Sequence, residues 1–204
     1  MTNNYLLRNA KVFDGKKMLS GTHSVLIEGS EISRIDEDSA FSDFSGEQYD
    51  LAGKTLMPGL IDCHVHLCHT ASGDPKADGL KLGPSQLTLL ALTNAQKTLK
   101  GGITSVRDCG GRDYLEFGVR DAINKGEFAG PTIHASGKMI CMTGGHGNSY
   151  GRIADGVEEV RKAVREQIHA GCDMIKIMAT GGVMTPGVNP EDAHYSAEEM
   201  ASGV

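Results

Sequence analysis

Two histidines one residue apart stand out in residues 58–67, PGLIDCHVHL, an apolar run with the character of a β-strand. Successive side chains of a strand point to opposite faces, so His64 and His66 project from the same face and can converge on one ion. The spacing therefore predicts a metal site, although an isolated pair of this kind is also common at positions without any ligand.

A lysine interrupts a second apolar run, residues 174–178, MIKIM, which otherwise resembles a buried strand. A buried ammonium group needs a partner or a reaction. The alternative is that Lys176 lies near a strand end and reaches water with its head group. Because both runs occur in one ordered succession of strands and helices, we favour a shared site for Lys176, His64 and His66.

The composition is that of a globular protein and excludes several functions. The chain has 204 residues, of which 39% are hydrophobic and 23% charged. A net charge of -6 without a polybasic cluster argues against a nucleic-acid partner. The amino terminus lacks a signal-peptide pattern and no apolar run reaches membrane-spanning length, so we predict a cytoplasmic protein with no membrane partner.

The cysteines are odd in number and mostly occupy apolar settings, which predicts reduced, packed thiols; they are Cys63, Cys68, Cys109, Cys141 and Cys172. A structural zinc site is an alternative, because two of these thiols alternate with histidines around residue 66. No second ligand pair follows at zinc-finger spacing, which disfavours that site.

Residues 1–57 predict a small β module of short strands, at residues 5–7, 11–13, 24–27 and 31–35. Tight turns are expected at Gly15 and Gly29, each preceded by an acidic residue. The polar residues 36–48 are predicted to be the loosest segment of the module.

From residue 58 onward, predicted strands alternate with helices, the helices at residues 84–100 and 114–125 and from 155 to Gly171, and the strands at residues 103–107, 132–135 and around Lys176. This alternation predicts parallel strands covered by helices. An open, doubly wound sheet is disfavoured because no glycine fingerprint for a dinucleotide follows the first strand. A barrel is favoured because its interior would gather His64, His66 and Lys176 at one face. Four strand–helix units make half of a barrel.

These features resemble the amidohydrolase superfamily, metal-dependent hydrolases built on a (βα)8 TIM barrel with a flanking β-sandwich module. The superfamily signature on the first barrel strand matches residues 58–66, and the motifs at residues 100–108 and 175–184 are similar to a branch related to imidazolonepropionases and Xaa-Pro dipeptidases. The resemblance implies two divalent metal ions, with zinc favoured over manganese and cobalt, held by His64, His66 and a carbamate formed from Lys176 and CO2. It also implies hydrolysis of an amide or peptide bond in a dipeptide or N-acyl amino acid.

The resemblance also implies parts that this sequence does not contain. Further histidine ligands and an aspartate general base are expected beyond residue 204, so the chain is expected to be an amino-terminal half and inactive alone. Ser196 begins a capping box with only a few residues after it, which agrees with that expectation. The alternatives are a mononuclear zinc deaminase of the same superfamily and a non-catalytic half-barrel. Exposed strand edges predict a homo-oligomer.

Several other side chains are candidates for the site. His146 follows the third strand in a glycine-rich loop, and the resemblance implies that it faces substrate. Arg112 and Tyr150 are weaker candidates for substrate contact. His69 and His134 are expected either to line the cavity or to pack in the core, and Asp62 to accept a hydrogen bond near the metal. The remaining histidines are expected on the surface; they are His23, His169 and His194.

Overall fold

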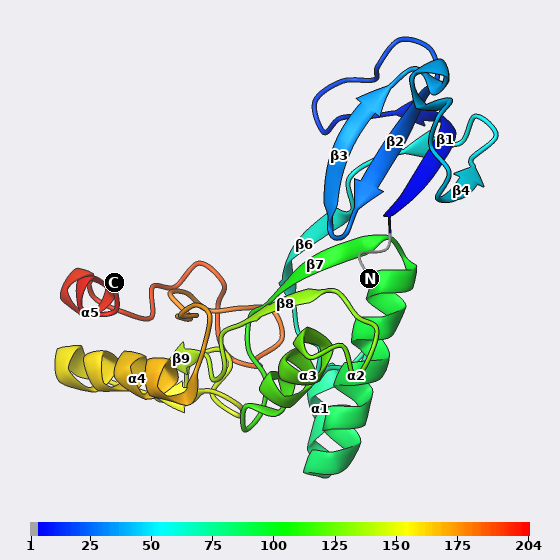
Figure 1. Ribbon diagram of the computed structural model, residues 1–204. Helices are drawn as coiled ribbons and strands as arrows, with labels where there is room; N and C mark the ends of the chain where they lie inside the picture. Colours follow the sequence, from blue (N-terminus) through cyan, green and yellow to red (C-terminus); the bar gives the residue numbers. More distant parts are fainter. Residues whose placement is uncertain (1–3) are drawn as a thin grey trace. The chain divides into compact units, whose positions relative to one another are not determined.

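The structure, a computed structural model, describes residues 4–204, with the side chain of Lys76 left out. The chain divides into two compact units, Met1–Gly59 and Leu60–Val204. The ribbon of both units is drawn in Figure 1. Among the described residues, no helix is both long enough and apolar enough to cross a lipid bilayer.

The first unit is built on one five-stranded sheet instead of the two packed sheets of the expected sandwich. Its strands are β1 (Asn4–Val12), β2 (His23–Glu28), β3 (Glu31–Asp36), β4 (Glu47–Asp50) and β5 (Thr55–Leu56). The order is β3-β2-β1-β4, and β5 pairs with the far end of β1. β1 joins the two predicted strands at residues 5–7 and 11–13 through a bulge, which lets one strand pair with β4 at its start and β5 at its end.

The predicted turns of this unit are confirmed, and the segment predicted to be its loosest contains a short helix that is tied to the sheet. Gly15 and Gly29 both have positive φ, as the tight turns require. Residues 36–48 include a short 3-10 helix, η1 (Asp38–Phe41). The carboxylate of Asp38 binds the Arg8 guanidinium and accepts a 2.6 Å hydrogen bond from Ser24 Oγ, which anchors this segment to the sheet.

The second unit contains three parallel strands in the order β6-β7-β8, with helices α2 and α3 packed on one face (Figure 1). The bounds are β6 (Leu60–Val65), α2 (Pro84–Lys100), β7 (Ile103–Asp108), α3 (Leu115–Asn124) and β8 (Thr132–Ala135). Val65, Leu67, Val106 and Ile133 contribute to the core between sheet and helices. A short helix, α1 (Pro75–Leu80), precedes α2. The described residues thus form a mixed α/β fold and not a closed barrel.

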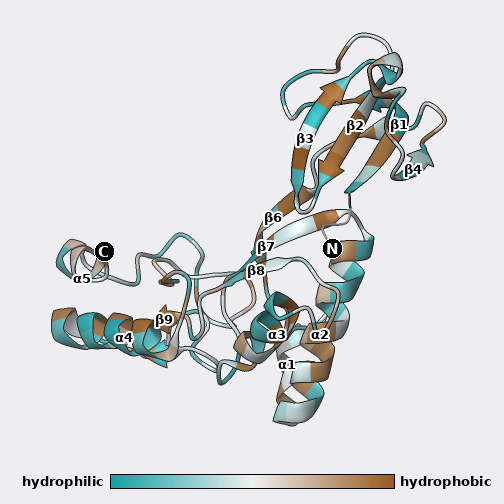
Figure 2. Ribbon diagram, viewed as in Figure 1, coloured by the Kyte–Doolittle hydropathy of each residue, from teal (hydrophilic) through white to brown (hydrophobic). Residues whose placement is uncertain are grey.

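The rest of the second unit packs around α4 (Gly156–Ala170). Two short parallel strands, β9 (Ile140–Cys141) and β10 (Arg152–Ile153), and the carboxyl-terminal helix α5 (Ala197–Ser202) accompany it. Hydrophilic and hydrophobic residues alternate along α4 (Figure 2), and its buried residues Val160 and Ala163 pack against Ile140 and Tyr195.

The helix boundaries follow most of the predicted signals. Gly171 ends α4 with φ of 92°, and Ser196 forms the predicted capping box with Glu199. Asp155 occupies the N-cap position of α4, but its side chain makes no capping bond there. Its carboxylate instead accepts hydrogen bonds from the backbone N–H and the hydroxyl of Thr143, because the chain passes close by on its way from β9.

The prediction of a regular strand around Lys176 is wrong. Ile177 alone makes a parallel bridge to Ile140 of β9. The Ile140 N–H donates to the Lys176 carbonyl and the Met178 N–H donates to the Ile140 carbonyl, both at 2.8 Å. The segment is extended and paired at one point, because its neighbour β9 is only two residues long.

Candidate active site

His64, on β6, and His66, directly after the end of β6, lie on the face of the sheet that is turned away from the helices. Val65 and Leu67 point into the core against α2 and α3, so the alternating positions His64 and His66 face the other way. Their ring centroids are 5.4 Å apart. His64 is exposed and His66 is half-buried.

A cavity of about 300 Å³ brings together the side chains that the sequence singled out, because His64, His66, His146 and Lys176 all line it. Lys176 is half-buried there, not enclosed in a strand as predicted. Burial, and next the charge of Lys176, lower the pKa of His64. The histidines of one strand and a lysine about 110 residues later in the sequence therefore share one space.

A hydrogen bond to the backbone fixes the ring of His66. Its Nδ1 lies 2.7 Å from the carbonyl oxygen of Gly110. A carbonyl only accepts, so Nδ1 carries the proton and Nε2 keeps its lone pair for a ligand. The expected acceptor, Asp62, does something else: its carboxylate accepts the backbone N–H of His64 at 3.0 Å.

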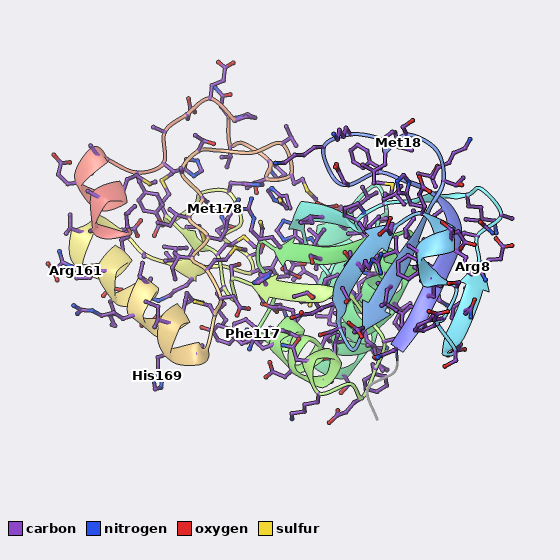
Figure 3. All side chains as sticks on the ribbon, turned by 45° about the horizontal axis from the view of Figure 1, so that its top comes forward. Arg8, Met18, Phe117, Arg161, His169 and Met178 are labelled. Atoms are coloured by element: carbon purple, nitrogen blue, oxygen red, sulfur yellow. The ribbon has the colours of Figure 1, made fainter. Side chains whose placement is uncertain are left out.

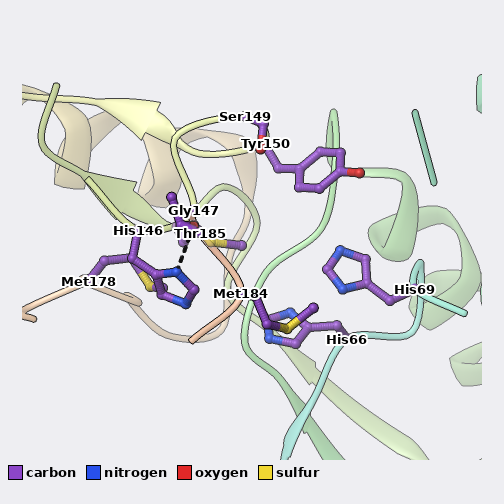
Figure 4. A pocket seen from close by; sticks show the side chains of 10 residues that line it. His66, His69, His146, Gly147, Ser149, Tyr150, Met178, Met184 and Thr185 are labelled. Atoms are coloured by element: carbon purple, nitrogen blue, oxygen red, sulfur yellow. Dashed lines mark hydrogen bonds between the residues drawn. The ribbon is translucent and has the colours of Figure 1, made fainter. Parts of the chain in front are cut away.

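His146 lies in the loop between β9 and β10, whose base is closed by the contact between Asp155 and Thr143. Its Nδ1 lies 2.8 Å from Thr185 Oγ1, on the segment that follows Lys176 (Figure 4). Gly182 lies so close that a Cβ atom at this position would overlap the imidazole. Both neighbours come from one segment, which holds the ring of His146 from the far side of the cavity.

A second, smaller cavity of about 70 Å³ adjoins the first, because His66 and His146 line both. It also contains His69 and Tyr150 (Figure 4). The ring of His69 stacks on His66 at 4.9 Å between centroids and lies 5.5 Å from the ring of Tyr150. Burial, together with the charge of His66, lowers the pKa of His69 to about 4, so His69 is neutral at physiological pH.

Other predicted residues lie elsewhere. His134 is exposed on β8 and lines neither cavity, and Arg112 donates a long hydrogen bond of 3.5 Å to the Leu82 carbonyl. His169 projects outward from the end of α4, as expected of a surface residue (Figure 3). His23 is half-buried. The prediction for His194 is wrong, because the residue is only 8% exposed and its ring packs against the glycine-rich loop at Gly145.

The donor set fits a metal in part. Within residues 4–204, no three side chains of His, Cys, Asp and Glu are grouped to hold an ion. His64 and His66 nevertheless face one cavity, and the hydrogen bond from His66 Nδ1 leaves the other nitrogen of that ring as a donor. A carbamate on Lys176 would add oxygen ligands to the two imidazoles. All five cysteines are free thiols, as the sequence predicted.

Sequence reasoning missed the groups that orient the site, namely the Gly110 carbonyl, Thr185 and Asp108. Asp108 accepts the backbone N–H of Leu67 next to His66, at 2.9 Å. The available signal was an aspartate at the end of an apolar strand, followed by a cysteine and two glycines. Thr185 carried no comparable signal.

Comparison with known proteins shows which family the chain belongs to. The sequence profile of the Amidohydrolase family matches residues 55–203. The chain belongs to the amidohydrolase family. Among curated proteins, it is 38% identical over 175 residues to ochratoxinase of Aspergillus niger, an alignment covering 71% of this chain and 35% of that protein.

Solved structures give the same result. A Xaa-Pro dipeptidase with bound methionine in the active site matches with a TM-score of 0.87 at 32% identity, over 98% of this chain and 53% of that one. A prolidase complexed with N-methylphosphonate-L-proline matches with the same score and identity, over 98% and 52%. The crystal structure of A. niger ochratoxinase follows with a TM-score of 0.82 at 28% identity, over 100% and 53%. The chain thus spans about half the length of these structures.

Proposed function

We propose that this chain is the amino-terminal part of a metal-dependent amidohydrolase that cleaves an amide or peptide bond in a dipeptide or N-acyl amino acid. Residues 60–204 would supply the first half of a TIM barrel, and the parallel strands β6, β7 and β8 would be its first three. The prolidase, dipeptidase and ochratoxinase relatives support this substrate class.

One observation carries the proposal: His64, His66, His146 and Lys176 line a single cavity. In this proposal His64, His66 and carboxylated Lys176 would together hold a pair of divalent metal ions, most simply zinc. The chemistry supplied by such ions is polarisation of the scissile carbonyl and activation of water.

The side chains of this unit would bind and orient the substrate. His146, held by Thr185, faces the cavity and would donate a hydrogen bond to the substrate. His69 and Tyr150 line the smaller cavity beside it and would exclude water from the adjoining substrate group. We expect the general base to lie outside these 204 residues.

Carboxylation of Lys176 gives the most direct test. The chain would be incubated with Zn2+ and 13C-labelled bicarbonate, and the carbamate carbon followed by 13C NMR. We expect a carbamate signal that is lost in Lys176→Ala and kept in the matched control Lys125→Ala, an exposed lysine at the end of α3. Bound zinc should fall in the Lys176 variant and in His64→Ala. Two zinc ions held equally well without Lys176 would contradict the proposal.

Activity is a separate question, to be answered with a panel of dipeptides and N-acyl amino acids. Turnover by this chain that His64→Ala abolishes would show that the half alone is catalytic. Zinc binding and carboxylation without turnover would assign the missing steps to residues outside this chain. Deamination, with one zinc ion and no carbamate, would favour the mononuclear deaminase instead.

A further inference from the structure

Asp108 forms the centre of a closed ring of hydrogen bonds around His66. It lies at the end of β7 with 0% of its surface exposed. One carboxylate oxygen accepts the N–H of Leu67 and the other accepts the N–H of Gly110, each at 2.9 Å. The Gly110 carbonyl in turn accepts the proton of His66 Nδ1.

This ring holds His66 at two points. The bond to Leu67 fixes the backbone immediately after His66, and the path through Gly110 fixes the imidazole itself. Asp108 holds the N–H of Gly110, while the adjoining peptide group that carries the Gly110 carbonyl is also held by the Gly111 N–H, which donates to the Gly137 carbonyl at 3.2 Å. Loss of the carboxylate would remove one of these two supports and so weaken the direction of the carbonyl toward Nδ1. The tautomer and the direction of Nε2 thus both depend on Asp108.

Gly110 is suited to this relay by its backbone. Its φ is 128°, in the region that glycine alone adopts without strain. A Cβ atom there would lie 2.8 Å from Met139 Cε and 3.2 Å from the Gly137 carbonyl. The chain can therefore turn its carbonyl toward His66 only with glycine at this position.

The turn after β6 offers a control residue, Asn94, that takes no part in the ring of hydrogen bonds around His66. Asn94 of α2 donates to the carbonyls of Leu67 and His69, at 2.9 and 3.0 Å. Loss of Asn94 would loosen the turn after β6, but it would leave the path from Asp108 through Gly110 to the imidazole of His66 intact.

We propose that Asp108 is a positioning residue, which holds His66 as the Nδ1–H tautomer and thereby directs Nε2 into the cavity. The consequence for metal affinity rests on the proposed function of His66 as a ligand. The tautomer itself does not, because it is a property of the metal-free chain.

The first experiment reads the tautomer in the metal-free 204-residue chain by 1H–15N correlation NMR of the histidine rings, with His66 assigned through His66→Gln. We expect Nδ1–H in the native chain, a larger share of Nε2–H in Asp108→Asn, and Nδ1–H in Asn94→Ala. Asp108→Glu keeps the charge and should shift the tautomer less than Asp108→Asn.

The second experiment measures Zn2+ affinity by competition with a chelator. Removal of such a supporting contact typically weakens metal binding about 10–100-fold, and we expect this for Asp108→Asn but not for Asn94→Ala. A tautomer that responds as stated in a chain that binds no zinc would refute the metal role and leave the positioning role intact. Nε2–H in the native chain, or a folded Asp108→Asn variant that keeps Nδ1–H, would overturn the proposal. If neither Asp108 variant folds, Asp108 is required for the fold itself and the assignment is withdrawn.

Discussion

Glu116 is a buried carboxyl group that should make the stability of this protein depend on pH. It lies in the first turn of α3 with 0% exposed surface. Burial, and next the charge of Asp108, raise the pKa of Glu116 to about 8. The two carboxyl groups differ in that Asp108 accepts two backbone N–H groups, so the proton belongs on Glu116.

The size of the effect follows from the difference between the folded and unfolded pKa values. The ordinary value is 4.5 and the folded value about 8, so the folded protein keeps a proton that the unfolded chain has lost. The contribution of Glu116 to the free energy of unfolding is fully present below the unfolded pKa. It is lost as the pH rises from the unfolded pKa to the folded pKa. Each pH unit in that window costs about 1.4 kcal/mol, and the whole window about 5 kcal/mol as a ceiling.

The perturbation is Glu116→Gln, which keeps the shape of the neutral carboxyl group and cannot ionise. Unfolding free energies would be measured by urea titration at pH 5.5 and 7.5. Relative to the native chain, we expect the variant to gain about 3 kcal/mol between these two values. The exposed residue Glu127 provides the control, since Glu127→Gln should follow the native pH dependence. Parallel curves for the native chain and Glu116→Gln would refute the reasoning.

Three further changes test other parts of the structure. Gly182→Ala should displace the His146 ring, seen as loss of its hydrogen bond to Thr185 in NMR spectra, and unchanged ring signals would contradict this close packing. Ser196→Ala should cost about 1 kcal/mol at the start of α5 and speed amide exchange there; equal exchange would contradict the capping role. Ile61 lies on the edge strand β6 and is 68% exposed. The native chain should therefore sediment as a dimer or larger species, and Ile61→Lys as a smaller species. A native monomer at micromolar concentration would contradict pairing between strand edges.

Local signals in the sequence were sufficient for much of the second unit. The helix predicted at residues 84–100 coincides with α2, because Pro84 at its start and glycine after its end are strong boundary signals. The strand predicted at residues 132–135 coincides with β8. The start of α4 at Asp155 is confirmed as well, but the side chain of Asp155 makes no capping bond, because its carboxylate accepts from Thr143 instead.

The Lys176 segment shows a second limit of pattern reading. Lys176 and His64 line one cavity, but the segment around Lys176 is not a regular strand, because a strand exists only where neighbouring strands pair with it. The neighbour present, β9, offers two residues. The apolar residues of a segment indicate that it is buried. Whether the segment forms a regular strand depends on the length of the neighbouring strand that can pair with it.

The orientation of His66 shows why residue types alone do not define a metal site. The spacing of His64 and His66 predicted that both rings share a face, and that prediction follows from strand geometry alone. Which nitrogen of His66 is available depends on the carbonyl of Gly110, and a carbonyl is present in every residue and leaves no trace in the sequence. What the sequence does record is the requirement behind it, a buried carboxylate at position 108 and a glycine two residues later. A strand end that carries Asp-x-Gly beside a His-x-His strand is therefore the more informative pattern, because it encodes the direction of the ligand as well as its presence.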